Sequence, residues 1–449
     1  MYVHSPPASN GLERARRREQ QHLDPNYMAE SYFTERLMSD FSLRTLDPAK
    51  ALLFYTPTWV VAEKSNTVYG KGVQHYQSLI DSLAADPIFS LAWRANRSRH
   101  LFWAGGDFGA CMWPRDGPMF MTHWGLTTPW RAMVMPHLWR SGGLASVRAT
   151  ETPCTDERDF IIPPSVRAPS LPSIGDDGSA SRGVDYHAMD HASGRKQWRC
   201  ELFFAGAIRS KSKNQRSSTC DDGAGGSVLC YSQGVRAAIF AHHASRKGFC
   251  VAERLSSKLL AQSRFCLAPS GEGFGDRLSL VLLSGCVPLI IQPAVRLPFE
   301  DLLPYDSFAV RVGTDAVPRL HTLLESISDA EHARMRMRVR RYAKVFNWFN
   351  VSSDGQLSNS GNGAGGGLAY DVTRYSLCLR AKQQASSCDE LRPSLLSPRV
   401  DGSGSTINGH VFGDPSVGRV DPALRRTEGS MGRARQSSGL WSKFVRWAG

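Results

Sequence analysis

The chain has 449 residues, with 54 lysines and arginines against 41 aspartates and glutamates, and its formal net charge is +13. This length allows two domains with additional segments, and the charge favours an anionic partner such as a nucleotide, an acidic polysaccharide or nucleic acid. The ten cysteines form no C-x-x-C pair, which argues against a zinc knuckle, so no metal site is expected.

The first folded region has the pattern of an α/β domain. It covers residues 25–140 and follows an N-terminal segment of residues 1–24. Its helix is expected from the spacing of the apolar residues, and its strands from short apolar runs, the first of which ends at Pro57. The expected elements are a helix over 27–41 and strands over 51–56, 101–104 and 132–136.

A change of composition follows this domain. Residues 141–195 are rich in Ser, Pro, Gly and Asp, apart from an apolar knot at 160–162. Such a composition buries too little apolar surface to offset the entropy of the chain. We therefore expect a linker and surface insertion that is largely disordered.

A second folded domain is expected over residues 196–351. The helix that begins at its capping box, Ser328 to Glu331, carries a row of arginines. A solvated face, with long side chains lying over an apolar surface, explains this row better than a dedicated nucleic-acid patch does. The arginines are Arg334, Arg336, Arg338, Arg340 and Arg341. The other expected elements are strands over 201–206 and 308–312 and a helix over 235–241.

The rest of the chain is expected to hold one more helix. It covers residues 368–382, after a flexible loop at 352–367 and before a disordered tail at 383–449. Residues 165–195, 352–367 and 390–449 are expected to be poorly ordered, because their composition cannot offset the loss of chain entropy.

The most informative stretch, FCLAPSGEGFGDRLSLVLLSGCVPLII, covers residues 265–291. Its pattern predicts a βαβ unit, whose crossover should be right-handed. Gly285 suits the left-handed position just past the helix. The predicted elements are a strand over 265–268, a loop with Gly271, Gly273 and Gly275, a helix over 276–284, and a strand over 287–291.

The loop of this unit has the chemistry of an anion site. Its backbone N–H groups and the start of the helix would point at one place, and Arg277 in the first turn can grip a phosphate with two hydrogen bonds. The alternative is a glycine turn that merely packs the helix on the sheet. Spacing alone leaves both open, because the pattern is not G-x-G-x-x-G.

No signal peptide or membrane anchor is visible. The longest apolar stretch is the βαβ unit itself, which is interrupted by Gly285 and Pro288 and is too short to span a bilayer. We therefore expect the chain either to be soluble or to lack its true N-terminus. Sequons at Asn96 and Asn350 favour a lumenal location only weakly. Some cysteines could pair in a secretory lumen, but their spacing does not say which.

The chain resembles the exostosin-like glycosyltransferases (glycosyltransferase family 47), in a form similar to green-algal members. The most specific part is the ordered string FCLAPSGEGFGDR, GCVPLII and RLPFEDLLPYDSFAVRV. Supporting blocks occur in the expected order from about residue 25 to 382. They are RTLDPAKALLFYTP, HLFWAGGDFGAC, DFIIPP, ELFFAGAIR, YSQGVR and LAYDVTRYSLCLR.

The resemblance implies a GT-B-like α/β fold, in which two Rossmann-like domains face a cleft. It also implies an inverting, metal-independent transfer of a sugar from a UDP-sugar to a glycan acceptor, with no cofactor other than the donor. The glycine loop would face the diphosphate, which backbone N–H groups and arginines would stabilise. The implied donor-binding residues are Ser270, Gly271, Glu272, Gly273, Gly275, Arg277, Arg209 and Arg236. For the arginines, a structural ion pair is the alternative.

An inverting transferase needs a base that takes the proton of the acceptor hydroxyl. Asp107, in GGDFGAC on the acceptor side, is the first candidate, and His100 and Asp159 are further ones. Asp107 could equally cap the loop after its strand.

Three positions depart from the family pattern. Leu280 stands where many members have a glutamate that is well placed to contact a ribose, Arg99 stands for an aspartate, and Gly106 stands for a histidine. Glu272 or Asp276 could compensate at the ribose. These departures put the identity of the donor, and the activity itself, in question.

Three functions are therefore compared. The first is an active glycosyltransferase in the lumen or membrane of the Golgi apparatus that acts in polysaccharide or glycoprotein glycan synthesis, with a possible partner glycosyltransferase. The second is a catalytically impaired, transferase-like protein that binds a glycan or assists another enzyme. The third, a nucleic-acid-binding protein, is not expected, because the aromatic and basic motifs of known modules are missing.

Overall fold

The structure is a computed structural model. It describes residues 1–4, 25–59, 78–106, 109–113, 117–128, 153–166, 198–208, 220–221, 227–228, 231–271, 273–348, 350–351, 357–358, 368–382 and 385–396. Within this part of the chain, the fold is α/β and is built on two five-stranded sheets.

The first sheet has the strand order β1-β2-β3-β4-β6, and all of its neighbouring strands are parallel. Trp103 packs in one apolar cluster with Phe33 of α2, whereas Phe102 packs in another with Phe89 of α5. Both faces are therefore buried, as is usual for a parallel sheet. The elements are β1 (Tyr2–Val3), α2 (Ala29–Ser39), β2 (Phe54–Thr56), α5 (Pro87–Ala95), β3 (His100–Ala104), β4 (Met119–Thr122) and β6 (Phe160–Ile161).

This sheet extends beyond the predicted range of 25–140. Its edge strands β1 and β6 lie at residues 2–3 and 160–161, in segments predicted to be an N-terminal segment and a linker. Strands of two residues carry no periodic pattern, so their partners alone define them. The strand predicted at 132–136 lies outside the described residues, and β4 holds the place next to β3.

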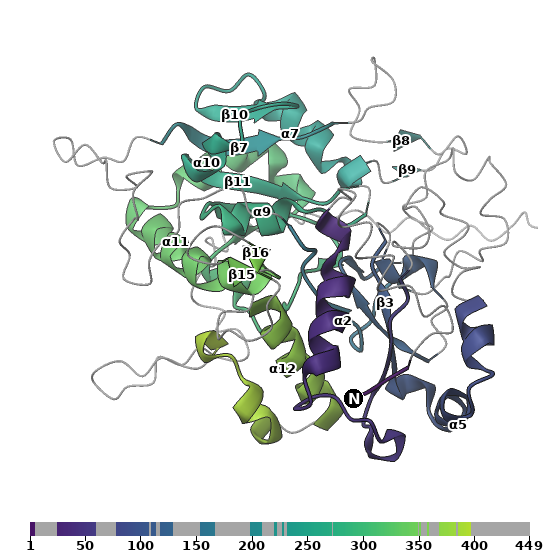
Figure 1. Ribbon diagram of the computed structural model, residues 1–449. Coiled ribbons are helices and arrows are strands. Elements are labelled where there is room, and N and C mark those ends of the chain that lie inside the picture. Colours follow the sequence, from purple (N-terminus) through teal and green to yellow (C-terminus); the bar gives the residue numbers. More distant parts are fainter. Residues whose placement is uncertain are drawn as a thin grey trace, which may run out of the picture. The chain divides into compact units, whose positions relative to one another are not determined.

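The second sheet has the order β10-β7-β11-β12-β14 and is also parallel throughout. Leu202 and Phe204 of β7 face one apolar cluster, and Phe203 and Ala205 face another, so this sheet too is buried on both faces. The teal and green ribbons of Figure 1 show it with its helices. The elements are β7 (Cys200–Ala205), α7 (Val235–His243), β10 (Phe249–Ala252), α8 (Lys258–Ala261), β11 (Ser263–Pro269), α9 (Arg277–Leu283), β12 (Val287–Ile291), β14 (Val310–Arg311), α10 (Leu320–Glu325) and α11 (Asp329–Ala343).

The predicted βαβ unit is confirmed. β11 and β12 pair in parallel, and α9 connects them. Gly285 has a φ of 69°, its N–H donates to the Leu282 carbonyl at 2.9 Å, and the Cys286 N–H donates to the Val281 carbonyl at 3.2 Å. These two bonds form a Schellman motif, so the helix ends as predicted. The Ser328 cap is also confirmed, since its Oγ accepts from the Glu331 N–H at 3.2 Å.

A short antiparallel pair connects the segments around the two sheets. β5 (Gly125–Leu126) pairs with β13 (Val295–Arg296). The Ala294 carbonyl accepts from the N–H of Thr127 at 2.8 Å and from its hydroxyl at 2.9 Å. The other short pairs are β8 (Cys220–Asp221) with β9 (Ser227–Val228) and β15 (Asn350–Val351) with β16 (Leu357–Ser358).

The helix α12 (Leu368–Lys382) begins and ends at the predicted residues and lies beside α2 (Figure 1). The Tyr370 hydroxyl donates to Asp40, just after α2, at 2.8 Å, and Arg36 of α2 pairs with Asp371 at 3.5 Å. A helix late in the chain therefore packs on the first sheet's helix layer.

The predicted disordered tail is wrong for its first residues. Two 3₁₀ helices, Ala385–Leu391 and Ser394–Leu396, follow α12, and a disulfide joins Cys378 to Cys388. This covalent link and the burial of Cys388 order a segment whose composition looked too polar to fold. Residues 397–449, all of 167–197 and almost all of 352–367 lie outside the described residues.

Four disulfides occur in the described part of the chain. Two of them connect neighbouring strands of the second sheet or their ends: Cys200 of β7 with Cys250 of β10, and Cys266 of β11 with Cys286 before β12. The others are Cys111–Cys154 and Cys378–Cys388. None of the helices described here is both long enough and apolar enough to cross a bilayer.

Candidate functional site

The candidate site lies at the carboxyl edge of the second sheet, where parallel α/β sheets bind their ligands. The glycine loop follows β11 there, and its backbone folds back tightly on itself. A Cβ at Gly271 would lie 2.8 Å from the Phe274 carbonyl oxygen, and a Cβ at Gly275 would lie 3.1 Å from the Pro269 carbonyl oxygen. The loop therefore needs these two glycines for close packing of its own backbone.

Arg236, in the first turn of α7, braces this loop. Its guanidinium donates to the Ser270 carbonyl from Nε at 3.2 Å and from Nη2 at 3.0 Å. Nη1 donates to the Ala207 carbonyl at 3.2 Å and to the Tyr231 hydroxyl at 3.0 Å. Its side chain is buried, 5% exposed. Arg236 thus ties the ends of β7 and β11 together while its charge stays at this edge.

Arg277 reaches the same point from α9. A Cβ at Gly206 would lie 3.3 Å from an Nη of Arg236 and 3.3 Å from an Nη of Arg277. Gly206 follows β7, so the missing side chain leaves room for both guanidinium groups. The side chain of Arg277 is half-buried, and among the described residues it has no hydrogen-bond or ion-pair partner. Two like charges held together at a partly buried place form a favourable environment for an anion.

The helix behind the loop contributes less positive electrostatic potential to the site than the sequence suggests. α9 has only seven residues, Arg277–Leu283, and Asp276 before it makes no capping bond with its side chain. The macrodipole of so short a helix is small, so the two arginines supply most of the positive charge at this site.

A turn that the sequence did not single out borders the same loop. Residues Tyr231–Gly234 precede α7, and Ser232 and Gln233 have φ values of 59° and 54°. The Ser232 N–H donates to the Gly271 carbonyl at 3.0 Å, and its hydroxyl donates to the Ser270 carbonyl at 2.7 Å. Non-glycine residues with a positive φ leave no signal in a sequence, since the conformation is imposed by such contacts.

Four of the predicted donor-binding residues, Ser270, Gly271, Arg277 and Arg236, therefore lie at one edge. Gly273 and Gly275 belong to the same loop, and Gly273 is buried. The remaining two, Glu272 and Arg209, lie outside the described residues.

His100 lies far from such an edge in its own sheet, because it is the first residue of β3. Its ring stacks on that of His4 at 5.8 Å and on that of Phe54 at 5.1 Å, and it is 0% exposed. Burial and the charge of His4 lower the pKa of His100 to about 3. This position suits a core residue, and it does not favour His100 as the base.

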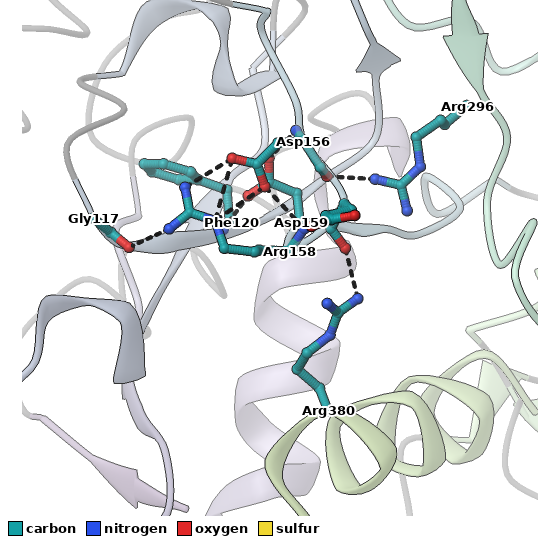
Figure 2. A network of polar contacts seen from close by, with 8 residues as sticks. Gly117, Phe120, Asp156, Arg158, Asp159, Arg296 and Arg380 are labelled. Carbon is teal, nitrogen blue, oxygen red and sulfur yellow. Dashed lines mark hydrogen bonds and ion pairs between the residues drawn. The ribbon is translucent and has the colours of Figure 1, made fainter. Parts of the chain in front are cut away.

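Asp159 is occupied by backbone hydrogen bonds. Figure 2 shows its carboxylate between the N–H of Phe120, which donates at 2.9 Å, and the N–H of Asp156, which also donates at 2.9 Å. In the same network Arg158 pairs with Asp156 at 2.8 Å, and Arg296 of β13 donates to the Asp156 carbonyl. Asp159 thus orders the segment that enters β6, which favours a structural role over that of a base. Asp107, the first candidate, lies outside the described residues.

The three residues that depart from the family pattern differ in their surroundings. Arg99 donates to the carbonyls of Leu52 and Ala51 and covers the Phe54 ring at 5.1 Å, so it holds the entry to β2. Leu280 is half-buried on α9, three residues after Arg277 and hence on the same face of the helix. Gly106 accepts from the Gly109 N–H at 2.8 Å in the turn after β3.

The glycine loop also contacts the carboxyl edge of the first sheet. The ring of Phe274 lies 5.2 Å from that of His123, which follows β4, and 5.7 Å from that of Tyr27. His123 is buried, and its Nδ1 lies 3.1 Å from the Ile162 carbonyl oxygen. Burial lowers the pKa of His123 to about 4, so the ring is neutral at pH 7. No motif in the sequence marks this histidine as a site residue.

The arginine row on α11 is only partly the solvated face that was predicted, because Arg334 and Arg340 are exposed whereas the other three arginines bind backbone carbonyls. Arg336 donates to the Gly285 carbonyl at 3.2 Å, Arg338 donates to the Ser307 carbonyl at 3.1 Å, and Arg341 donates to the Leu395 carbonyl. Arginines that satisfy backbone carbonyls are not available to a nucleic-acid backbone.

Comparison with known proteins identifies the family of the chain. The family model of the exostosin GT47 domain matches residues 1–327. A probable glucuronosyltransferase of Oryza sativa subsp. japonica is 25% identical over 307 residues, which cover 67% of this chain and 64% of that protein.

Two relatives come from Arabidopsis thaliana. A probable glucuronoxylan glucuronosyltransferase is 26% identical over 310 residues, which cover 65% of this chain and 56% of that protein. A probable beta-1,4-xylosyltransferase is 24% identical over 313 residues, which cover 68% of this chain and 66% of that protein. The chain thus spans just under two thirds of the length of the first of these relatives. Because the family model matches well over half of its residues, the chain belongs to the exostosin GT47 family.

Proposed function

We propose that this protein is a glycosyltransferase that moves a sugar from a UDP-sugar to a hydroxyl group of a glycan acceptor. The observation that carries the proposal is the pair Arg236 and Arg277, which converge beside Gly206 and the glycine loop. Membership of the exostosin GT47 family and the glucuronosyl- and xylosyltransferase names of the relatives supply the reaction class.

In this reaction the acceptor oxygen attacks the anomeric carbon from the side opposite the diphosphate. The bond from that carbon to the β-phosphate oxygen breaks, UDP leaves with the electron pair, and the configuration of the sugar inverts. A base takes the proton of the acceptor hydroxyl, and Asp107 remains our candidate for it. The GT-B arrangement, in which the two sheets present acceptor and donor to each other, belongs to the same proposal.

The role of the arginines follows from the charge that develops. The leaving diphosphate becomes more negative as the glycosidic bond breaks, and fixed cations stabilise it most when water is excluded. Arg277 would contact the diphosphate directly, because its guanidinium is not engaged by the described residues. Arg236, tied to the Ser270 carbonyl, would hold the loop in place. With two guanidinium groups at this position, we propose a transfer that does not depend on a metal ion.

A Golgi location is part of the proposal. Four disulfides in the described part of the chain fit an oxidising compartment of the secretory pathway. The acceptor would then be a polysaccharide or a glycoprotein glycan, and a partner glycosyltransferase would be compatible with this setting.

The second candidate is a catalytically impaired member of the family that binds a glycan or assists another enzyme. Leu280, in place of a carboxylate on the Arg277 face of α9, is the observation that favours it. One experiment distinguishes the two candidate functions. The purified chain is incubated with UDP-glucuronic acid, UDP-xylose and other UDP-sugars, and UDP release is measured with and without xylan oligosaccharides. Acceptor-dependent release supports the transferase. UDP binding without release supports the impaired protein. The absence of any UDP binding would contradict the transferase and also favour the impaired protein, because a glycan-binding or accessory protein needs no donor.

A further inference from the structure

The turn before α7 is conformationally strained. Ser232, Gln233 and Gly234 have φ values of 59°, 54° and 76°, three successive left-handed residues of which only one is glycine. Each non-glycine residue in this region costs about 1–2 kcal/mol relative to a right-handed one. Such strain persists where the surroundings enforce it, and it concentrates at ligand-binding places.

The surroundings that enforce it belong to the candidate donor site. The backbone and hydroxyl of Ser232 both bind carbonyls of the glycine loop, those of Gly271 and Ser270. Arg236, two residues after the turn, binds the Ser270 carbonyl as well. The strained turn, the loop and one of the two arginines therefore form a single hydrogen-bonded unit.

The side chain of Gln233 is held within this unit, with one polar atom left over. Its Nε2 donates to the Pro293 carbonyl, just after β12, at 2.8 Å, which fixes which way the amide points. Its Oε1 is buried and has no hydrogen-bond partner among the described residues, and the residue is only 6% exposed. The hydroxyl oxygen of Ser270, a residue that is 2% exposed, is likewise buried without a hydrogen-bond partner among the described residues.

Leaving such atoms unpaired is unfavourable. A buried polar group without a partner costs about 1–3 kcal/mol, and most native proteins leave very few of them. Here the two unpaired atoms, Gln233 Oε1 and Ser270 Oγ, lie on the turn before α7 and on the glycine loop, the two segments that the hydrogen bonds of Ser232 join. A ligand that supplies the missing partners would account for both unpaired atoms.

We propose that Gln233 is a specificity-determining residue for the donor, and that its Oε1 accepts a hydrogen bond from an O–H or N–H group of the nucleotide sugar. An amide oxygen can only accept, so the ligand must donate. The hydroxyl of Ser270, which can donate or accept, provides a second contact next to the phosphate-binding arginines. This inference rests on the proposed function, since it presumes that a UDP-sugar binds at this edge.

The donating group comes either from the sugar or from the nucleotide, and the test distinguishes the two. Gln233→Gly removes the side chain while glycine adopts the left-handed conformation without cost, so the variant should fold. Loss of one neutral hydrogen bond should weaken binding about three- to ten-fold. Calorimetry on the full chain with UDP, UDP-xylose and UDP-glucuronic acid measures the effect.

Ala294→Gly is the matched control. Ala294 also has a positive φ, 55°, and is exposed, and the change removes no polar atom. It should leave all three affinities unchanged. Gln233→Glu is the second variant, because it keeps an accepting oxygen at the Oε1 position but cannot donate to Pro293. It should retain more affinity than Gln233→Gly if the ligand contact matters, after correction for any change in melting temperature.

The outcomes separate clearly. Weaker binding of the UDP-sugars alone assigns the contact to a sugar hydroxyl, and equal weakening of UDP assigns it to the nucleotide. Unchanged affinities in Gln233→Gly overturn the inference and leave the proposed function intact. No binding of any of these compounds by the parent chain overturns both.

Discussion

Basic side chains cluster at one edge of each large sheet, histidines at the first and arginines at the second, and the two clusters differ in charge. At the amino end of β3, His100 stacks on His4, and both are almost fully buried. At the carboxyl end of β11, Arg236 and Arg277 converge beside Gly206. Burial makes the histidines neutral, whereas an arginine stays charged in any protein environment. The first edge is therefore a packing site, and only the second has the charge to hold a diphosphate.

The histidine edge should make the protein sensitive to acid, which is the largest effect we expect. Burial lowers the pKa of His4 to about 4 and that of His100 to about 3, below the 6.5 of an unfolded histidine. Protons therefore bind the unfolded chain better, so stability is fully present above pH 6.5 and is lost as the pH falls below it. Between pH 7 and pH 5 each histidine should cost about 2 kcal/mol.

The charges around this pair oppose one another. Asp86 favours protonation of His4, whereas Arg99 and the partner ring disfavour protonation of His100. Urea unfolding at pH 7 and pH 5 tests the prediction, with His100→Phe as the variant that keeps a ring but cannot titrate. The pH dependence of this variant should be smaller by about 2 kcal/mol. Equal pH dependence in the parent and the variant would show that His100 is not buried neutral.

The stability of the arginine edge at β11 should depend on the disulfide between Cys266 and Cys286. Cys266 and Cys286 close a loop of about 20 residues that contains the glycine loop and α9. Replacing both with alanine should lower the free energy of unfolding by about 3 kcal/mol, mainly because the unfolded chain gains freedom. Denaturant unfolding of the oxidised proteins measures this, and the double alanine variant at Cys378 and Cys388 is the control. The control should lose stability without losing UDP affinity, since its disulfide joins α12 to the 3₁₀ helix that follows it and neither cysteine belongs to the second sheet or the glycine loop.

Arg277→Ala tests whether the charge at the second edge binds the donor. Losing a charge-assisted hydrogen bond costs about 1.5–3 kcal/mol, so UDP affinity should fall roughly ten- to a hundred-fold. Arg277→Lys should recover only part of it, because an ammonium lacks the planar fork. Arg340→Ala, an exposed arginine of α11, should leave the calorimetric affinity unchanged. A folded Arg277→Ala protein with normal UDP affinity would remove the basis of the phosphate site.

Leu280→Glu should have the smallest effect, and it sharpens the role of the same helix face. Leu280 lies three residues after Arg277 and is half-buried. If it replaces a ribose contact, a carboxylate there should tighten UDP binding by about 0.5–1.5 kcal/mol or reveal transfer activity. Leu280→Gln, which is similar in size but uncharged, separates the charge from the shape. Tighter binding in neither variant would mean that the ribose lies elsewhere.

Local patterns in the sequence determined the parts of this protein that are short-range. The βαβ unit, the left-handed Gly285, the Ser328 cap and the bounds of α12 were all predicted, because each depends on residues a few positions apart. The resemblance of the glycine-loop motif also located four donor-site candidates on one edge, since the carboxyl ends of parallel strands meet there.

Only the tertiary structure decided which of these residues meet and in what state. Arg236 binds a carbonyl 34 positions away, His100 is buried beside a ring near the N-terminus, and the left-handed Gln233 is set by contacts with another loop. The edge strands β1 and β6 exist because their partners lie beside them. Such pairings depend on the position of every other element, and no local pattern of two or three residues encodes them.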